Sequence, residues 1–207
     1  MKVLSTLILI LFSQPQFING QIFEGFGIKA GFTSSNIEMY YNNSKYESMD
    51  RNSSFHFAVF KDFLISIPLL LNTELEYSTK GFDFPEIKDN VEIDCLSFKV
   101  LGKYILDSQI ISPYISIGPR LDYIFNKRAN LTTQEGYEMP LDWANYFTDF
   151  SFGLSTQFGI ESRIMNSVSL LFEFSYNYDL SNSTNGKHPN VTFFRNNSFD
   201  ISLGLKF

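Results

Sequence analysis

The chain has 207 residues, a formal net charge of −6 and a sequence pI of about 4.9, which argues against nucleic acid as a partner, because nucleic-acid-binding domains carry basic surfaces. Charged residues make up 18% of the chain, below the ~25% typical of soluble domains, and aromatic residues make up 17%. Phe and Tyr favour strands and membrane interfaces, so this composition favours a β protein that contacts lipid. Cys95 is the sole cysteine, which excludes an intramolecular disulfide.

The first 20 residues have the pattern of an export signal. Lys2 gives a basic start, residues 3–12 form an apolar run, and Gly20 supplies the small residue expected before a cleavage site. The alternative is an N-terminal membrane anchor, but a run of ten residues falls short of the ~20 that a transmembrane helix needs. We therefore expect residues 1–20 to be a secretory signal peptide and residues 21–207 to form a single domain.

Eight segments of the remaining chain alternate between large apolar and small or polar residues. Successive side chains of a strand point to opposite faces, so each segment has one apolar and one polar face. The fourth segment is the least regular; we favour Leu96 and Phe98 outward with Cys95 and Lys99 inward, and a bulge would shift that register by one. The expected strands cover residues 24–32, 54–62, 68–78, 91–105, 114–125, 147–160, 168–178 and 198–207.

The connections between these segments alternate in length. Residues 62–67, 106–113 and 161–167 form short turns, whereas residues 33–53, 79–90, 126–146 and 179–197 form long polar loops. This layout is typical of outer-membrane barrels, in which tilted strands of ~9–11 residues span the bilayer. A soluble ligand-binding calyx would have the opposite pattern, with its apolar face inside. The sequence therefore predicts an all-β fold, an eight-stranded antiparallel up-and-down transmembrane β-barrel in the outer membrane of a Gram-negative-type bacterium.

The inward faces of the expected strands carry charges that need partners. Glu74 and Glu76 on the third strand are placed to meet Lys99 and Lys103 on the fourth. An eight-stranded barrel is just wide enough to be filled by its own side chains, so we interpret these charges as a structural plug. A path for protons or ions is the alternative. The same network is expected to include Arg120, Glu161, Glu173 and Asp200.

The last segment keeps its outward alternation to the final residue of the sequence. Leu203, Leu205 and Phe207 share one face, and outer-membrane barrels commonly end on an aromatic residue that the barrel-assembly machinery recognises. We interpret these three residues as an assembly signal. Changes at Phe207 are expected to impair assembly far more than changes at Lys206.

Several blocks of the sequence resemble a known family over nearly the whole mature chain. They are residues 25–31 (GFGIKAG), 55–60 (FHFAVF), 74–81 (ELEYSTKG), 114–119 (YISIGP) and 202–207 (SLGLKF), of which the third is the most specific. The chain resembles the outer-membrane-protein β-barrel domain family, often called PorT-like. It departs from the family at Asp94-Cys95, where members often have a proline, and in loops rich in Asn and Ser. The resemblance implies an eight-stranded outer-membrane barrel and a link to protein secretion, but it fixes no function.

No residue pattern indicates catalysis or a cofactor. A Ser-His-Asp site needs a histidine between a nucleophile and an orienting carboxylate. Asp142 and Asp179 could supply the carboxylate, but the spacing of His56 and His188 to them does not indicate such a site. One Cys and two scattered His do not form a metal site. We expect no enzyme, cofactor or metal. Exposed loop aromatics such as Tyr40 suit either partner binding or anchoring at the membrane interface, and for Trp143, next to the sixth expected strand, we favour anchoring.

Two functions follow from this interpretation. The first is a structural or interaction scaffold with long surface loops, linked to secretion or surface binding. The alternative is a narrow transport barrel for a small solute or ion. The expected partners are outer-membrane lipid, the barrel-assembly machinery and envelope or secretion proteins.

Overall fold

The computed structural model describes residues 24–41, 44–46, 50–84, 89–106, 108, 110–130, 148–165, 167–184 and 191–207. The expected signal peptide and the residues Asp142, Trp143 and His188 lie outside these ranges. Within the described ranges, no helix is long and apolar enough to cross a membrane.

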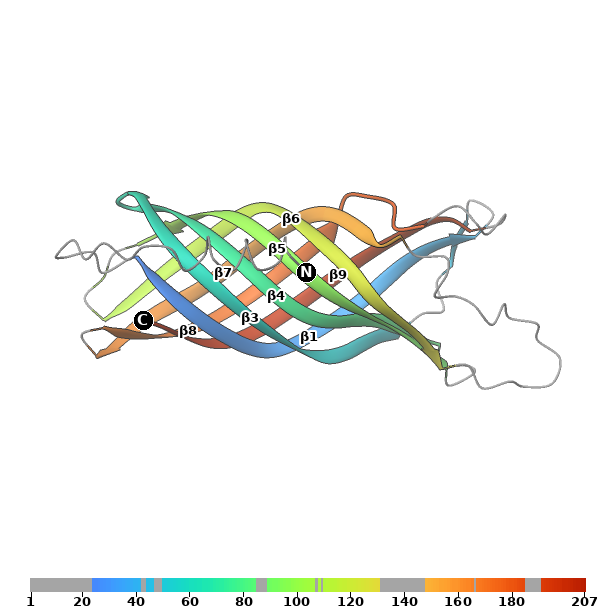
Figure 1. The fold of residues 1–207 in the computed structure, drawn as a ribbon, viewed down its shortest axis with the longest axis horizontal. Helices are drawn as coiled ribbons and strands as arrows, with labels where there is room; N and C mark the ends of the chain where they lie inside the picture. Colours follow the sequence, from blue (N-terminus) through green and yellow to red (C-terminus); the bar gives the residue numbers. More distant parts are fainter. Residues whose placement is uncertain are drawn as a thin grey trace, which may run out of the picture.

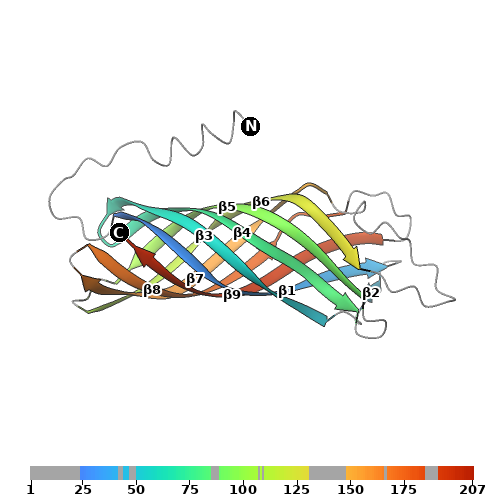
Figure 2. The same ribbon diagram turned by 60° about the horizontal axis from the view of Figure 1, so that its bottom comes forward.

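Antiparallel strands follow one another in chain order and close on themselves (Figures 1 and 2). Each long strand pairs with the next, and β9 pairs with β1 from Gly27↔Lys206 to Tyr41↔Val191, so the eight long strands form a closed barrel. The expected fold class is confirmed. The short β2 pairs only with the end of β1. The strands are β1 (Gly25–Tyr41), β2 (Ser44–Tyr46), β3 (Asp50–Ser66), β4 (Leu69–Phe84), β5 (Asp89–Ile105), β6 (Ile111–Asn130), β7 (Phe150–Met165), β8 (Val168–Asp179) and β9 (Val191–Lys206).

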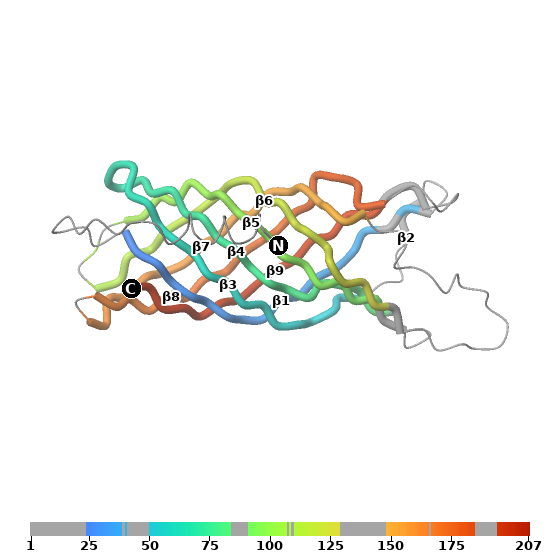
Figure 3. Tube along the Cα trace, viewed as in Figure 1, coloured from blue at the N-terminus to red at the C-terminus, as the bar shows by residue number. Residues whose placement is uncertain are grey.

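The strands cross the barrel obliquely, as the tube in Figure 3 makes plain. Both Gly25, the start of β1, and Phe207 lie at the rim of the tight turns, where their strands pair through Phe26 and Phe207. The turn between β3 and β4 consists of Ile67 and Pro68 alone. We call this the short-turn rim and the opposite end the loop-side rim.

The strands extend farther toward the loop-side rim than the sequence predicts. The expected loop 33–53 is wrong in large part, because β1 continues to Tyr41 and β3 begins at Asp50. The expected loops 79–90, 126–146 and 179–197 likewise lose residues to β4, β5, β6 and β9. The added stretches are polar on their outward face, as at Ser34 and Asn36, yet their backbones stay paired. An outward apolar face therefore marks the part of a strand that meets lipid, and the strand itself continues beyond it.

Large apolar side chains face outward and polar side chains are buried inside, as expected. In β3, for example, Phe55 and Phe57 are 70% and 49% exposed, whereas His56 between them is 3% exposed. β5 keeps the expected register, with Cys95 and Lys99 inward. A bulge is present, but the extra residue lies in β6: Asp94 pairs with Asn126 and Cys95 with Ile124, which leaves Phe125 unmatched.

The barrel interior as candidate functional site

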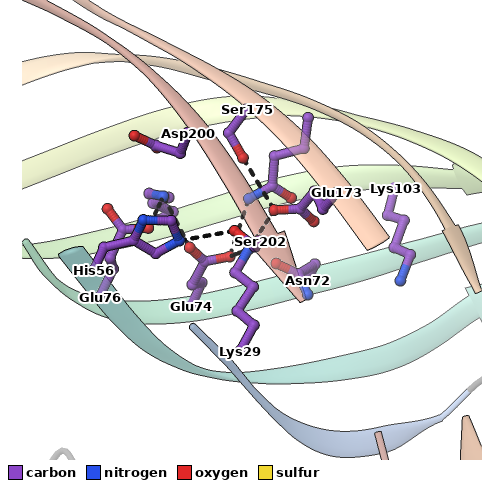
Figure 4. A network of polar contacts seen from close by, with 12 residues as sticks. Lys29, His56, Asn72, Glu74, Glu76, Lys103, Glu173, Ser175, Asp200 and Ser202 are labelled. Atoms are coloured by element: carbon purple, nitrogen blue, oxygen red, sulfur yellow. Dashed lines mark hydrogen bonds and ion pairs between the residues drawn. The ribbon is translucent and has the colours of Figure 1, made fainter. Parts of the chain in front are cut away.

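The inward side chains form a packed, charged core along the barrel axis, part of which is drawn in Figure 4. Its ionisable members come from all eight long strands, because every strand places alternate side chains inside. They gather in three clusters, one near the short-turn rim, one in the middle and one toward the loop-side rim.

The middle cluster is built around two lysines. Lys99 on β5 donates to Glu74 at 2.8 Å and to Glu76 at 2.7 Å, both on β4. Lys29 on β1 bonds Glu74 at 2.7 Å and also bonds Glu173 on β8. All five side chains are at most 4% exposed, so water screens these attractions very little.

Neutral donors complete the middle cluster. The Tyr114 hydroxyl donates to Glu173 at 2.7 Å, and the Gln157 amide donates to Glu74 at 3.0 Å. Tyr114 bonds the Glu173 oxygen that Lys29 does not contact, whereas Gln157 shares Glu74 Oε2 with Lys29. Both bonds lower the cost of burying the carboxylates.

The cluster at the short-turn rim pairs two lysines with two acids. Lys103 bonds Asp62 at 2.9 Å and also bonds Glu161. Lys206 contacts the same two carboxylates, with Asp62 at 3.3 Å. Asn72 adds a bond to Asp62 at 2.7 Å. The cluster therefore links strands β3, β4, β5, β7 and β9 inside the barrel.

The loop-side cluster is organised by Arg120 on β6. Its Nε lies 3.1 Å from Asp122, and its Nη2 bonds Asp179 on β8. Lys80 on β4 bonds Asp122 at 2.8 Å. A planar guanidinium suits this role because it can face more than one carboxylate at once.

The structure brings together only some of the residues that the sequence singles out. Lys99 lies between Glu74 and Glu76, as expected. Lys103 does not reach those glutamates and lies with Asp62 and Glu161, because four residues along a strand carry it about 13 Å toward the short-turn rim. Arg120 and Glu173 belong to different clusters.

Sequence reasoning missed six members of the network. All six occupy inward positions of their strands, so the alternation that identified the others also contained their signal. Lys206 is among them: its side chain is buried and ion-paired inside the barrel, next in sequence to the outward Phe207. The missed residues are Lys29, Asp62, Lys80, Asp122, Asp179 and Lys206.

Above the loop-side cluster the interior becomes apolar. Ile37, Phe82, Ile93, Ile124 and Phe194 are each at most 4% exposed and face inward on β1, β4, β5, β6 and β9. A cavity beside them and another beside Lys29 and Tyr114 each hold about 10 Å³, no more than one water molecule requires. The described interior is thus filled by ion-paired side chains in the middle and by apolar side chains toward the loops.

The His56 ring contacts the Ser202 hydroxyl at 2.8 Å (Figure 4) and the Thr33 hydroxyl at 2.9 Å. Among the residues described, no group of three or more His, Cys, Asp or Glu side chains is placed to hold a metal ion.

Comparison with solved structures finds outer-membrane barrels. OprG from Pseudomonas aeruginosa is 15% identical with a TM-score of 0.53, and the match covers 92% of this chain and 99% of OprG. The solid-state NMR structure of AlkL in lipid bilayers is 16% identical with a TM-score of 0.53, covering 94% of each chain. At these identities the likeness concerns the fold.

Comparison with curated protein sequences finds no match. The family model of the outer membrane protein beta-barrel domain matches residues 12–185, which is most of the chain. This match agrees with the resemblance seen in the sequence and with the closed barrel, and it places the protein in the outer membrane. The chain belongs to the outer membrane protein beta-barrel domain family.

Proposed function

We propose that the protein is a closed, non-conducting barrel that serves the outer membrane as a structural and interaction scaffold. The observation that carries this proposal is the filled interior, in which buried lysine and arginine side chains are paired with carboxylates of facing strands. A solute path would need these pairs to part, and a buried charge left without its partner costs about 3–5 kcal/mol.

The strand extensions at the loop-side rim support the interaction half of the proposal. Their backbones remain paired with neighbouring strands beyond the last outward apolar residues, for example at Asp50↔Asp83 between β3 and β4. A binding surface on a rigid support loses less conformational entropy on binding than one on a free loop. The barrel would therefore act as the rigid base from which this rim meets an envelope or secretion protein.

Planar-bilayer recording of the refolded protein tests closure. We expect no reproducible channel steps from wild type under conditions in which a general porin inserts and conducts. Regular open-channel steps whose ion selectivity changes in Glu74→Lys would contradict closure and support the transport alternative.

Cys95 offers a second readout of the same property. It is 1% exposed and faces inward beside the loop-side cavity, so a water-soluble maleimide should not label it in the folded barrel. Cys95→Ser combined with Ser108→Cys is the matched control, because Ser108 is exposed at the short-turn rim and should react. Rapid labelling of wild type would show that solvent enters the interior.

Site-specific photo-crosslinking in intact cells tests the interaction half. A photoreactive residue at Asp50, which is exposed at the loop-side rim, is expected to capture a discrete protein partner. The same residue at Ser108, on the opposite rim, is the control. Protein adducts from position 108 but none from position 50 would sink the proposal that the loop-side rim is the binding surface.

A further inference from the structure

The outward face changes from apolar to polar at nearly the same position on three adjacent strands, and the apolar face of β9 continues one outward residue farther toward the loops than those of β1 and β3. On β1 the step runs from Phe32 to Ser34, and on β9 it runs from Phe199 to Asn197, with Ser34 and Phe199 paired in the register. On β3, Phe55 is 70% exposed and the next outward residue is Ser53. In outer-membrane barrels the apolar outward face ends in a girdle of aromatic residues. The step on the loop side of the barrel therefore lies at the headgroups of the outer leaflet.

Three aromatic rings form a continuous surface at this level, which we call the aromatic shelf: Phe199 on β9 with Tyr176 and Tyr178 on β8. The ring centroids of Phe199 and Tyr176 are 4.6 Å apart, and those of Tyr176 and Tyr178 are 6.4 Å apart. Phe199 and Tyr176 are 53% and 37% exposed, so the shelf is open to the membrane.

An arginine lies over each end of the aromatic shelf. The Arg51 guanidinium carbon is 5.1 Å from the centre of the Phe199 ring, and that of Arg195 is 4.8 Å from the centre of the Tyr178 ring. Ser34 holds Arg51 through Nε and Nη2, both at 3.0 Å, and the Tyr178 hydroxyl bonds Arg195. Stacking and hydrogen bonding thus fix both guanidinium groups at the point where lipid headgroups begin.

We propose that the aromatic shelf and its two arginines bind a phosphorylated glycolipid of the outer leaflet. Guanidinium groups match phosphate geometry and form charge-assisted hydrogen bonds with it. The hydrogen bonds of Arg51 to Ser34 use Nε and Nη2, and Nη1 is assigned to a phosphate oxygen. The rings between the arginines and the apolar band below them suit the acyl chains. Two separated cations favour a headgroup with two phosphates over one with a single charge.

One acidic residue opposes this binding and sharpens its test. Glu38 lies opposite Arg195 in the β1–β9 register, so a carboxylate is close to one of the two proposed phosphate positions. It lowers the local positive charge from two to one. Removing this carboxylate is therefore expected to strengthen binding of the anionic lipid.

The test measures the affinity of the refolded, detergent-solubilised protein for bis-phosphorylated lipid A. We expect Arg51→Gln and Arg195→Gln each to weaken binding about tenfold, the scale of one hydrogen bond to a charged group, and the double variant more. Glu38→Gln should bind several-fold more tightly. Lipid A stripped of phosphate should bind weakly to wild type, and inorganic phosphate should not compete, since it lacks the acyl chains.

Lys61→Gln is the matched control, because Lys61 also lies over an aromatic ring, 4.9 Å from the centre of Phe63, but near the short-turn rim. Its affinity should equal that of wild type. All variants lie on the outer surface, and the folded band in a heat-modifiability gel verifies each one. Unchanged affinity in the double arginine variant, or an equal loss in Lys61→Gln, would overturn the proposal. Competition by inorganic phosphate would reassign the site to the free anion.

Discussion

Replacing Lys99 with methionine is expected to destabilise the barrel by about 3–5 kcal/mol, because breaking a buried ion pair leaves uncompensated charge behind. Methionine keeps most of the apolar length of lysine and removes the ammonium group that bonds Glu74 and Glu76. Glu74 would keep Lys29, whereas Glu76 would lose the cation that the structure places on it. Urea unfolding of the refolded protein, followed by the heat-modifiable gel band, measures the change.

Two further variants separate charge from packing. Lys127→Met removes an ion pair with Asp149, whose side chain is 68% exposed, and should change stability by no more than about 0.5 kcal/mol. Adding Glu76→Gln to Lys99→Met should restore part of the loss, because the uncompensated carboxylate disappears. If the double variant is as unstable as Lys99→Met alone, the lost stability comes from packing and the charge argument is wrong.

The sequence predicts the direction of nearly every strand side chain, because alternation is a local property. Phe55 outward and His56 inward follow from the period of two alone. Even the irregular strand β5 keeps its expected parity at Cys95 and Lys99, since the bulge at Phe125 belongs to its neighbour. The fold class depends on this alternation and could therefore be predicted from the sequence.

Contacts between adjacent strands could also be predicted from the sequence. Glu74 and Lys99 are directly opposite in the β4–β5 register, so chain order is sufficient to suggest their pairing. Contacts that cross the interior between strands that are not adjacent could not be predicted. Arg120 reaches Asp179 from β6 to β8, and Lys103 reaches Glu161 from β5 to β7. Such pairs depend on barrel radius and strand tilt, which no single segment encodes.

The ends of the strands escaped prediction for a different reason. Ser34 and Asn36 look like loop residues, but they pair with β9 while Ile37 on the same strand packs inside. Outside the bilayer the outward face can be polar, and in β1 the inward face is also polar at Thr33 and Ser35, so Ile37 is the one inward apolar residue among its described side chains that marks this stretch as a strand. That signal is weak in a stretch rich in Ser and Asn.

Gly31→Ala is expected to prevent or strongly impair closure of the barrel. A Cβ at Gly31 would lie 1.8 Å from the Ile201 carbonyl oxygen and 2.8 Å from the Ser202 Cα, both of them backbone atoms of β9 that cannot turn aside. Gly31 pairs with Ser202 between β1 and β9, and the pairing of these two strands joins the two ends of the sheet. Overpacking a closed core costs about 1–3 kcal/mol, and a clash with backbone at the closing pair belongs at or above the upper end.

Gly102→Ala is the matched control for this prediction. Its added Cβ would meet only the Ile117 carbonyl oxygen, at 3.8 Å, which is ordinary contact. We expect Gly102→Ala to refold with the yield and urea midpoint of wild type, and Gly31→Ala to give a much weaker folded band and a lower midpoint. Because both changes replace glycine by alanine in a strand, a general effect of alanine would appear equally in both. Equal behaviour of the two variants would mean that β1 and β9 yield easily, and that close approach at Gly31 does not govern closure.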